Sequence, residues 1–309
     1  MPNTVPIQLD LAAPDPDAGG EIARIIDGRL RAQGRALADP PPPLHQLWPA
    51  EFFGLHKVRL FAEADAERRE RILDGCAKTL LNEAYFIEKS GMAYCAKMIL
   101  LACSPQVEQV YSLIAADEAT HLQWIRPYVA EEQRQRPEGE FLRFLGGLIE
   151  RCDQNTLAYL VQVILEGWGL HHYRNLGKAC RYAPLKNVFM AIHRDEALHH
   201  HTGEVVFQPS QTTGEQAALV ADALRTYTEL VRVGPQAVAG VLDREFGGLG
   251  KARLAQVFGE LESERTSAEK LGILRSLMAG PGRERYLAAL DEAGAFTPYA
   301  PSACAAIHG

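Results

Sequence analysis

The stretches that decide the fold are Asp-Glu-Ala-Thr-His at residues 117–121 and Asp-Glu-Ala-Leu-His at residues 195–199. They are two copies of one motif, Asp-Glu-Ala-x-His. Each copy places a glutamate and a histidine three residues apart, so the two side chains share one face of an α-helix. A single cation could therefore be bound by both side chains of a copy.

The repeat extends upstream of these two motifs. The shift that carries Glu118 onto Glu196 also carries Glu88 onto Glu166. The chain thus contains a lone Glu followed by Glu-x-x-His, twice, with 30 residues between the lone and the paired Glu in both halves. This is the ligand inventory of a dinuclear metal site inside a four-helix bundle. The predicted metal-binding and catalytic residues are Glu88, Glu118, His121, Glu166, Glu196 and His199.

The residue types indicate which metal would bind. Two divalent ions in a dry core need anionic ligands, and four carboxylates supply that neutralisation. Oxygen and imidazole ligands without thiolates suit iron or manganese better than structural zinc. We therefore expect two Fe ions, cycling between Fe²⁺ and Fe³⁺, with Mn as the alternative.

Three further residues adjoin the repeated motifs. A metal-bound histidine usually donates its other ring N–H to a carboxylate or carbonyl. We expect Asp195 to hold His121 and Asp117 to hold His199, each across the bundle. His193 lies one turn before Glu196, so it is either a third histidine ligand or a histidine that packs nearby.

The first ligand has a competitor, because Glu83 also falls in a plausible inward series with Leu80 and Ile87. We choose Glu88 because it obeys the internal repeat. Gly91 and Gly169 lie one turn after the two lone glutamates. They either leave room for dioxygen or substrate, or allow close packing of helices.

The pattern resembles the ferritin-like di-iron carboxylate superfamily. Residues 194–199 are similar to the second Glu-x-x-His of ribonucleotide reductase small subunits, and Gly203-Glu204 is similar to the same helix of aldehyde-deformylating oxygenases. His193 resembles the third histidine of N-oxygenating di-iron enzymes, with a spacing that differs by one residue. The resemblance covers about residues 66–206. It implies an all-α, ferritin-like four-helix bundle with additional N- and C-terminal helices.

The resemblance also implies a dioxygen-dependent oxygenase or oxidase that acts on a small organic substrate in biosynthetic metabolism. N-oxygenation, hydroxylation and C–C cleavage all remain open. No flavin or iron–sulfur motif is present in the sequence, so an external ferredoxin or reductase would supply electrons. Iron storage with ferroxidase activity, or a non-catalytic dimetal protein, is the alternative. A further alternative is a radical-generating subunit like the small subunit of ribonucleotide reductase. Ile125 argues against it, because those subunits carry a tyrosine at this position.

Composition narrows the classes of partner. The chain has 309 residues, a formal net charge of −7 and 47% hydrophobic residues. Without a basic surface, nucleic acid and anionic membrane are not expected partners. No apolar run approaches ~20 residues, and the N-terminus does not resemble a signal peptide. The six cysteines form no Cys-x-x-Cys pair and read as reduced, so we expect a cytoplasmic protein.

Proline- and glycine-containing junctions along the chain predict three regions. Residues 1–45 combine a disordered start, a short helix from Glu21 to Gln33 and a Pro-rich connector. Residues 46–208 form the bundle, with helices over about 65–102, 105–136, 138–179 (broken near 146–147) and 184–207. Residues 209–309 form a C-terminal helical extension packed on the bundle, with helices near 213–232, 235–245, 250–259, 264–278 and 282–293. A homodimer is the generic assembly for such a chain.

Overall fold

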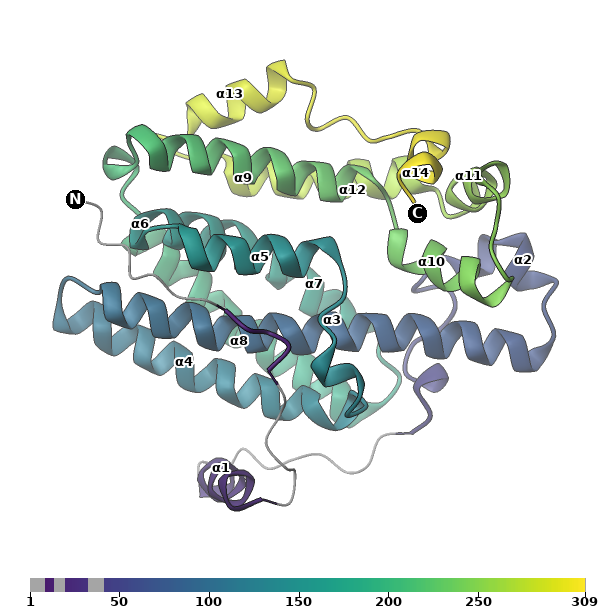
Figure 1. Cartoon of the computed structure of the whole chain (residues 1–309), viewed down its shortest axis with the longest axis horizontal. Coiled ribbons are helices and arrows are strands. Elements are labelled where there is room, and N and C mark those ends of the chain that lie inside the picture. The colour runs from purple at the N-terminus through teal and green to yellow at the C-terminus, as the bar shows by residue number, and fades with distance from the viewer. Residues whose placement is uncertain (1–8, 14–19, 33–41, 309) are drawn as a thin grey trace.

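The computed structural model describes residues 9–13, 20–32 and 42–308 (Figure 1). It is 77% helical and its described residues contain no strand, which confirms the all-α class. Most of the predicted disordered start and much of the predicted Pro-rich connector, residues 1–8, 14–19 and 33–41, lie outside the described part of the chain.

Four helical segments, which we call the central helices, carry all six predicted ligands. The first two pack along each other, the last two do the same, and the second also contacts the fourth. Figure 1 shows the first of them as the long helix that runs through the molecule. The central helices are α3 (Ala66–Leu101), α4 (Pro105–Ile125), the joined pair η5 (Ala158–Glu166) and α7 (Gly167–Ala179), and α8 (Ala183–Val206).

The helix starts follow from local chemistry. The Asp65 carboxylate accepts a hydrogen bond from the backbone N–H of Arg68 at 2.7 Å and caps α3. Ser104 caps α4 in the same way, with Pro105 in the first turn where its missing N–H has no effect. These caps confirm the predicted starts of both helices. The second helix, expected to reach residue 136, ends at Ile125 and continues as short 3₁₀ turns, because Pro127 cannot donate a helical hydrogen bond.

The predicted break at residues 146–147 is wrong, because α5 (Glu140–Arg151) runs through both glycines. The chain turns instead at Cys152, which is extended, and Asp153 then caps α6 (Gln154–Leu157) through the N–H of Thr156 at 2.8 Å. The buried Lys97 ammonium donates to the carbonyl of Ile149 at 2.7 Å, near the end of α5. A cation at the negative end of a helix is favourable, so the pair fixes this end.

The third central helix is not regular. Its first part, η5, is a nine-residue π-helix that ends at Glu166. Gly203 of α8 lies against it, and a Cβ added there would stand 2.4 Å from the Cβ of Gln162. His200 Nδ1 lies 3.1 Å from the Gln162 carbonyl oxygen. The wider turn therefore fits against α8 only because residue 203 has no side chain.

The remaining helices surround the central four. α12 packs against α7 and η5, α9 packs against α5 and η5, and α10 packs against α3. Figure 1 shows α9 and α12 running together along one side of the molecule. In the described part of the chain, no helix is long and apolar enough to cross a membrane. These elements are α1 (Glu21–Ala32), η1 (Leu44–Gln46), η2 (Leu55–Lys57), α2 (Arg59–Ala62), α9 (Gly214–Arg232), α10 (Gln236–Glu245), α11 (Lys251–Glu260), α12 (Ser263–Met278), α13 (Glu284–Glu292) and α14 (Pro301–Ile307). Of these, η1, η2, α2 and α14 were not predicted.

Candidate metal centre

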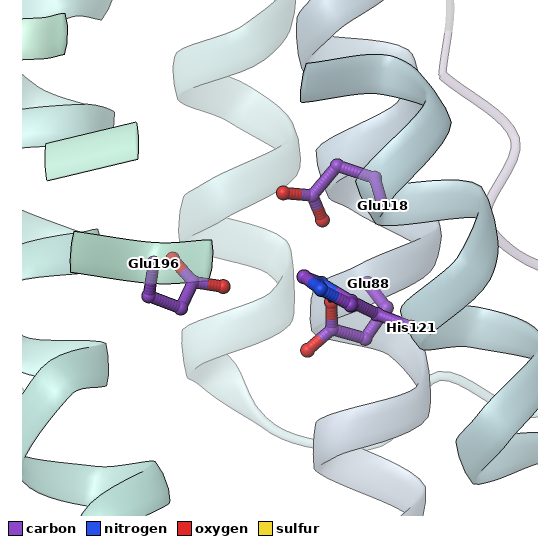
Figure 2. A group of neighbouring side chains, drawn as sticks. All are labelled: Glu88, Glu118, His121 and Glu196. Atoms are coloured by element: carbon purple, nitrogen blue, oxygen red, sulfur yellow. The ribbon is translucent and has the colours of Figure 1, made fainter. Parts of the chain in front are cut away.

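Four of the six predicted residues form one buried group. Ligand-type atoms of Glu88, Glu118, His121 and Glu196 all lie within 4.8 Å of one another. Figure 2 shows the Glu196 carboxylate directed from α8 toward the three side chains that come from α3 and α4. All four residues are buried. Their donor atoms are therefore close enough to surround one metal ion.

A second group contains the other two predicted residues. Atoms of Glu118, Glu166 and His199 lie within 4.8 Å of one another. Glu118 belongs to both groups, so its carboxylate stands between them. The structure thus brings all six residues from four helices into one cluster, which we call the carboxylate–histidine cluster.

Each histidine of the cluster contacts carboxylates on both sides of its ring. His121 Nε2 lies 3.1 Å from Asp195 Oδ2, and His199 Nε2 lies 3.6 Å from Asp117 Oδ2. These are the two cross-bundle pairs expected from the sequence. The Nδ1 atoms face inward, 3.1 Å from Glu88 Oε2 for His121 and 3.2 Å from Glu118 Oε1 for His199. The aspartates can therefore fix both rings with Nδ1 toward the shared carboxylates.

Burial and crowding change the acidity of these groups. Burial raises the pKa of Glu88 and of Glu196, and it raises the pKa of Glu166 to about 8. Burial alone would lower the pKa of His121, yet hydrogen bonds to Asp195 and Glu88 raise it to about 10. In the metal-free cluster, bound protons reduce the repulsion among these carboxylates. A divalent cation could replace the protons.

The pKa of His199 follows the same rule. Burial opposes its protonation, but the adjacent carboxylates of Asp117 and Glu118 raise the pKa to about 12. The neighbouring carboxylates therefore favour the charged form of both imidazoles in the metal-free cluster. Metal binding requires an unprotonated imidazole nitrogen, so we expect it to release protons.

The two lone glutamates have different surroundings. Glu88 is fully buried, and its Oε1 accepts a short hydrogen bond from the hydroxyl of Tyr173. Glu166 is partly exposed, and among the described residues its Oε2 has no hydrogen-bond partner although solvent does not reach that atom. Glu196 Oε2 is likewise buried without a hydrogen-bond partner in the described structure. Such orphaned carboxylate oxygens are costly unless something binds them.

The two glycines next to the lone glutamates also differ. A Cβ on Gly91 would stand 2.2 Å from Glu118 Oε2, whereas a Cβ on Gly169 would come no nearer to another residue than 4.0 Å, at Tyr173. Gly91 therefore makes room for the carboxylate shared by the two groups. Of the two roles that the sequence left open, close packing describes Gly91, and only the surroundings of Gly169 are open.

Two competing candidates lie outside both groups. Glu83 is five residues before Glu88 and is not among the clustered atoms; its electrostatic partners are Lys270 of α12 and Tyr227 of α9. His193 is also outside the groups, and its buried Nδ1 has no hydrogen-bond partner within the described residues. The structure places Glu88, rather than Glu83, with the other five residues.

Sequence reasoning did not assign the residues that support the cluster. Tyr173 lies two turns after Glu166, a spacing that indicates the same helix face and that could have identified it. Tyr111 donates to Gln162 Oε1 at 2.7 Å and packs edge to face on Tyr94. No short motif marks these pairs, because their partners come from helices far apart in the sequence.

No family model, curated protein or solved structure matches this chain.

Proposed function

We propose that this chain is a ferritin-like, non-haem di-iron oxygenase or oxidase that uses dioxygen to oxidise a small organic substrate. The observation that supports this proposal most directly is the carboxylate–histidine cluster, in which two groups of ligand atoms from four helices share Glu118. That arrangement supports two metal ions side by side, since a shared carboxylate can bind both.

The donor set fits iron. It offers four carboxylates and two imidazoles, with no cysteine in either group. The orphaned oxygens of Glu166 and Glu196 also indicate that something positively charged belongs between them. Hard oxygen donors with imidazole suit iron or manganese, whereas a closed zinc site would favour thiolates.

The protein's own groups have separate tasks in this proposal. Asp195 and Asp117 orient the two imidazoles, and the Tyr173 hydroxyl fixes one oxygen of Glu88. A pair of ferrous ions held here would supply electrons to dioxygen. The buried walls around the cluster exclude water, and the substrate has to be placed against the partly exposed side at Glu166.

Some reactions of this class consume more electrons per turnover than the substrate supplies. For these reactions the proposal requires an external electron donor, a ferredoxin or a reductase. The choice among N-oxygenation, hydroxylation and C–C cleavage is made by the residues that position substrate, because similar ligand sets serve all three. The homodimer and the cytoplasmic location expected from the sequence stay predictions.

The test is anaerobic loading with Fe(II), followed by rapid mixing with dioxygen and a metal count per chain. We expect two irons per chain and a transient visible absorption that the Glu196→Ala variant lacks. The Glu108→Ala variant is the matched control, because Glu108 is an exposed glutamate of the same α4 helix as Glu118. Retention of two irons with only slow growth of ferric oxide would favour iron storage and contradict an oxygenase.

A further inference from the structure

The π-helix η5 is contacted at both ends by the C-terminal helical extension. Just after its last residue, Glu166, a Cβ added to Gly167 would stand 2.7 Å from Leu277 Cδ2 of α12. Near its start, the guanidinium of Arg283 lies over the ring of Tyr159, with its carbon 5.1 Å from the ring centroid. The extension has no task in the function proposed above, yet it touches the segment that carries a candidate metal ligand.

Arg283 is the charged member of these contacts. It is only 5% exposed, although it lies in the loop between α12 and α13. Its two terminal nitrogens lie 3.1 and 2.6 Å from the two carboxylate oxygens of Glu204 on α8. A bidentate pair of this kind fixes the orientation of the guanidinium plane as well as its position.

Two stacked aromatic rings lie against the same guanidinium. Its carbon is 5.2 Å from the ring centroid of Phe207, just after α8, which is close to its distance from Tyr159. The Tyr159 and Phe207 rings stack on each other with centroids 4.6 Å apart. The Tyr159 hydroxyl also donates to the carbonyl of Met278 at 3.4 Å. Cation–π contact and the ion pair together join η5, α8 and the extension through one side chain.

The loop backbone brings Arg283 to this position. Gly282 has a φ of +76°, and a Cβ there would stand 2.6 Å from the Cβ of Pro209. The backbone N–H of Arg283 donates to the carbonyl of Gly280 at 3.1 Å. A side chain at residue 282 would force the loop away from the end of α8, so glycine is required for this approach.

The ion pair adjoins the closest approach of α8 to η5. A Cβ on Gly203 would stand 3.2 Å from the carbonyl oxygen of Ala158, the first residue of η5. Glu204 follows Gly203 directly and binds Arg283. The backbone contact and the arginine pair therefore act on the same turn of η5.

The position of Glu166 depends on the π-helix. Each residue of an α-helix turns by about 100° around the axis, and a π turn contains more residues than an α turn. If η5 relaxed to a regular α-helix, Glu166 would rotate by about 100° or more relative to the start of the segment. That rotation would take its carboxylate away from Glu118 and His199, with which it forms the second group of ligand atoms.

We propose that Arg283 is a positioning residue for Glu166. It anchors the start of η5 to α8 through Tyr159 and Glu204, and the π-helix that it maintains holds the Glu166 carboxylate in the second group. Arg283 itself belongs to neither group of ligand atoms. This role rests on the proposed function, because it concerns the second of the two metal ions.

The test is anaerobic calorimetric titration of the full-length chain with Fe(II). In the Arg283→Met variant we expect the first iron to bind as in the unchanged chain and the second at least about tenfold more weakly. Arg275→Met is the matched control, because Arg275 forms a bidentate pair with Asp291, at 3.0 and 2.7 Å, in the exposed part of the same extension. Unchanged binding of both irons, or equal weakening of both, would overturn the proposal.

Two more variants test the pair itself. Arg283→Lys keeps the charge and loses the bidentate geometry, so it should weaken the second iron less than Arg283→Met. Glu204→Met should weaken it as Arg283→Met does, and the double variant should lose little more than either single variant, since both remove one interaction. Additive losses in the double variant would contradict anchoring through Glu204.

Hydrogen exchange of the metal-free chain provides a readout that does not depend on iron. Arg283→Met should accelerate exchange at the backbone N–H groups of residues 162–166 and leave α3 and α4 unchanged. Equal acceleration in all the central helices would indicate general destabilisation and contradict a positioning role. Two irons bound tightly by Arg283→Met would reject this proposal and leave the oxygenase proposal in place. Fewer than two irons in the unchanged chain, with local acceleration in the variant, would reject the di-iron function and retain the anchoring of η5.

Discussion

Glu88 and Glu166 occupy equivalent positions of the sequence repeat, yet the structure treats them differently. Glu88 lies in a regular helix, fully buried and hydrogen-bonded to Tyr173. Glu166 ends a π-helix, is partly exposed and has an unpaired oxygen in the described structure. A symmetric ligand inventory therefore gives an asymmetric site, with a closed half at the fully buried Glu88 and an open half at the partly exposed Glu166.

The largest effect is expected from the residue that both halves share. Glu118→Ala removes the carboxylate common to the two groups, so fewer than one metal ion per chain should remain. Glu88→Ala, which affects the closed half alone, should leave the second group able to bind. Metal analysis after anaerobic loading measures both, with Glu108→Ala as the control. Equal loss in the Glu88 and Glu118 variants would argue against a shared carboxylate.

The next largest effect is expected on the stability of the π-helix, which ends at Glu166 and has no counterpart at Glu88. Gly203→Ala places a Cβ 2.4 Å from the Cβ of Gln162 and 3.2 Å from the carbonyl of Ala158, so overpacking should cost about 1–3 kcal/mol in unfolding free energy. Gly272→Ala is the control, because nothing lies within 4 Å of its added Cβ. Chemical denaturation measures both. An unchanged Gly203→Ala chain would mean that the π-helix does not depend on this contact.

The two glycines of the repeat sharpen the comparison further. Gly91→Ala should displace the Glu118 carboxylate and weaken metal binding about tenfold, a loss of ~1.4 kcal/mol. Gly169→Ala should leave metal affinity unchanged and stabilise the helix slightly. Competition with a chromophoric chelator measures the affinities. If both variants bind metal equally well, the tight contact at Gly91 has no functional consequence.

The most gradual effect is the pH dependence of the metal-free chain, which is spread over several pH units. The pKa of Glu166 is about 8 when folded and near its ordinary 4.5 when unfolded, so the folded chain binds more protons between these values. Stability should therefore be greatest below about pH 5 for this group and fall as pH rises toward 8, by at most about 1.4 kcal/mol per pH unit. The raised pKa values of His121 and His199 act in the same direction, with their loss at higher pH.

Thermal unfolding across this pH range, with and without bound Fe(II), measures the effect. Metal displaces the protons, so the loaded chain should lack the decline, and its metal affinity should rise with pH. Metal-free stability that increases between pH 5 and 8 would contradict the raised pKa values. The loaded chain serves as the internal control for titration elsewhere in the protein.

The sequence predicted the all-α class and most helix bounds because caps and prolines act locally. Asp65, Ser104 and Pro105 mark their helix ends without help from the rest of the chain. The six cluster residues could be chosen because a metal site needs particular side chains at helical spacing. The choice of Glu88 over Glu83 needed the repeat, since periodicity alone allowed both.

Features set by tertiary contacts could not be predicted. The break at Cys152 is fixed by Asp153 and by Lys97 from another helix, whereas the two adjacent glycines that suggested a break stay helical. The π-helix depends on Gly203 of α8, and no periodicity marks it. The electrostatic interaction of Glu83 with Lys270 links positions far apart in sequence, so only the folded chain shows it.

The central claim is that two metal ions lie on either side of the Glu118 carboxylate. Anomalous diffraction at the iron absorption edge, from crystals of the full-length chain loaded anaerobically with Fe(II), tests it directly. The account predicts two peaks, one among Glu88, His121 and Glu196 and one between Glu166 and His199. A single peak, or iron bound only outside the carboxylate–histidine cluster, would contradict it.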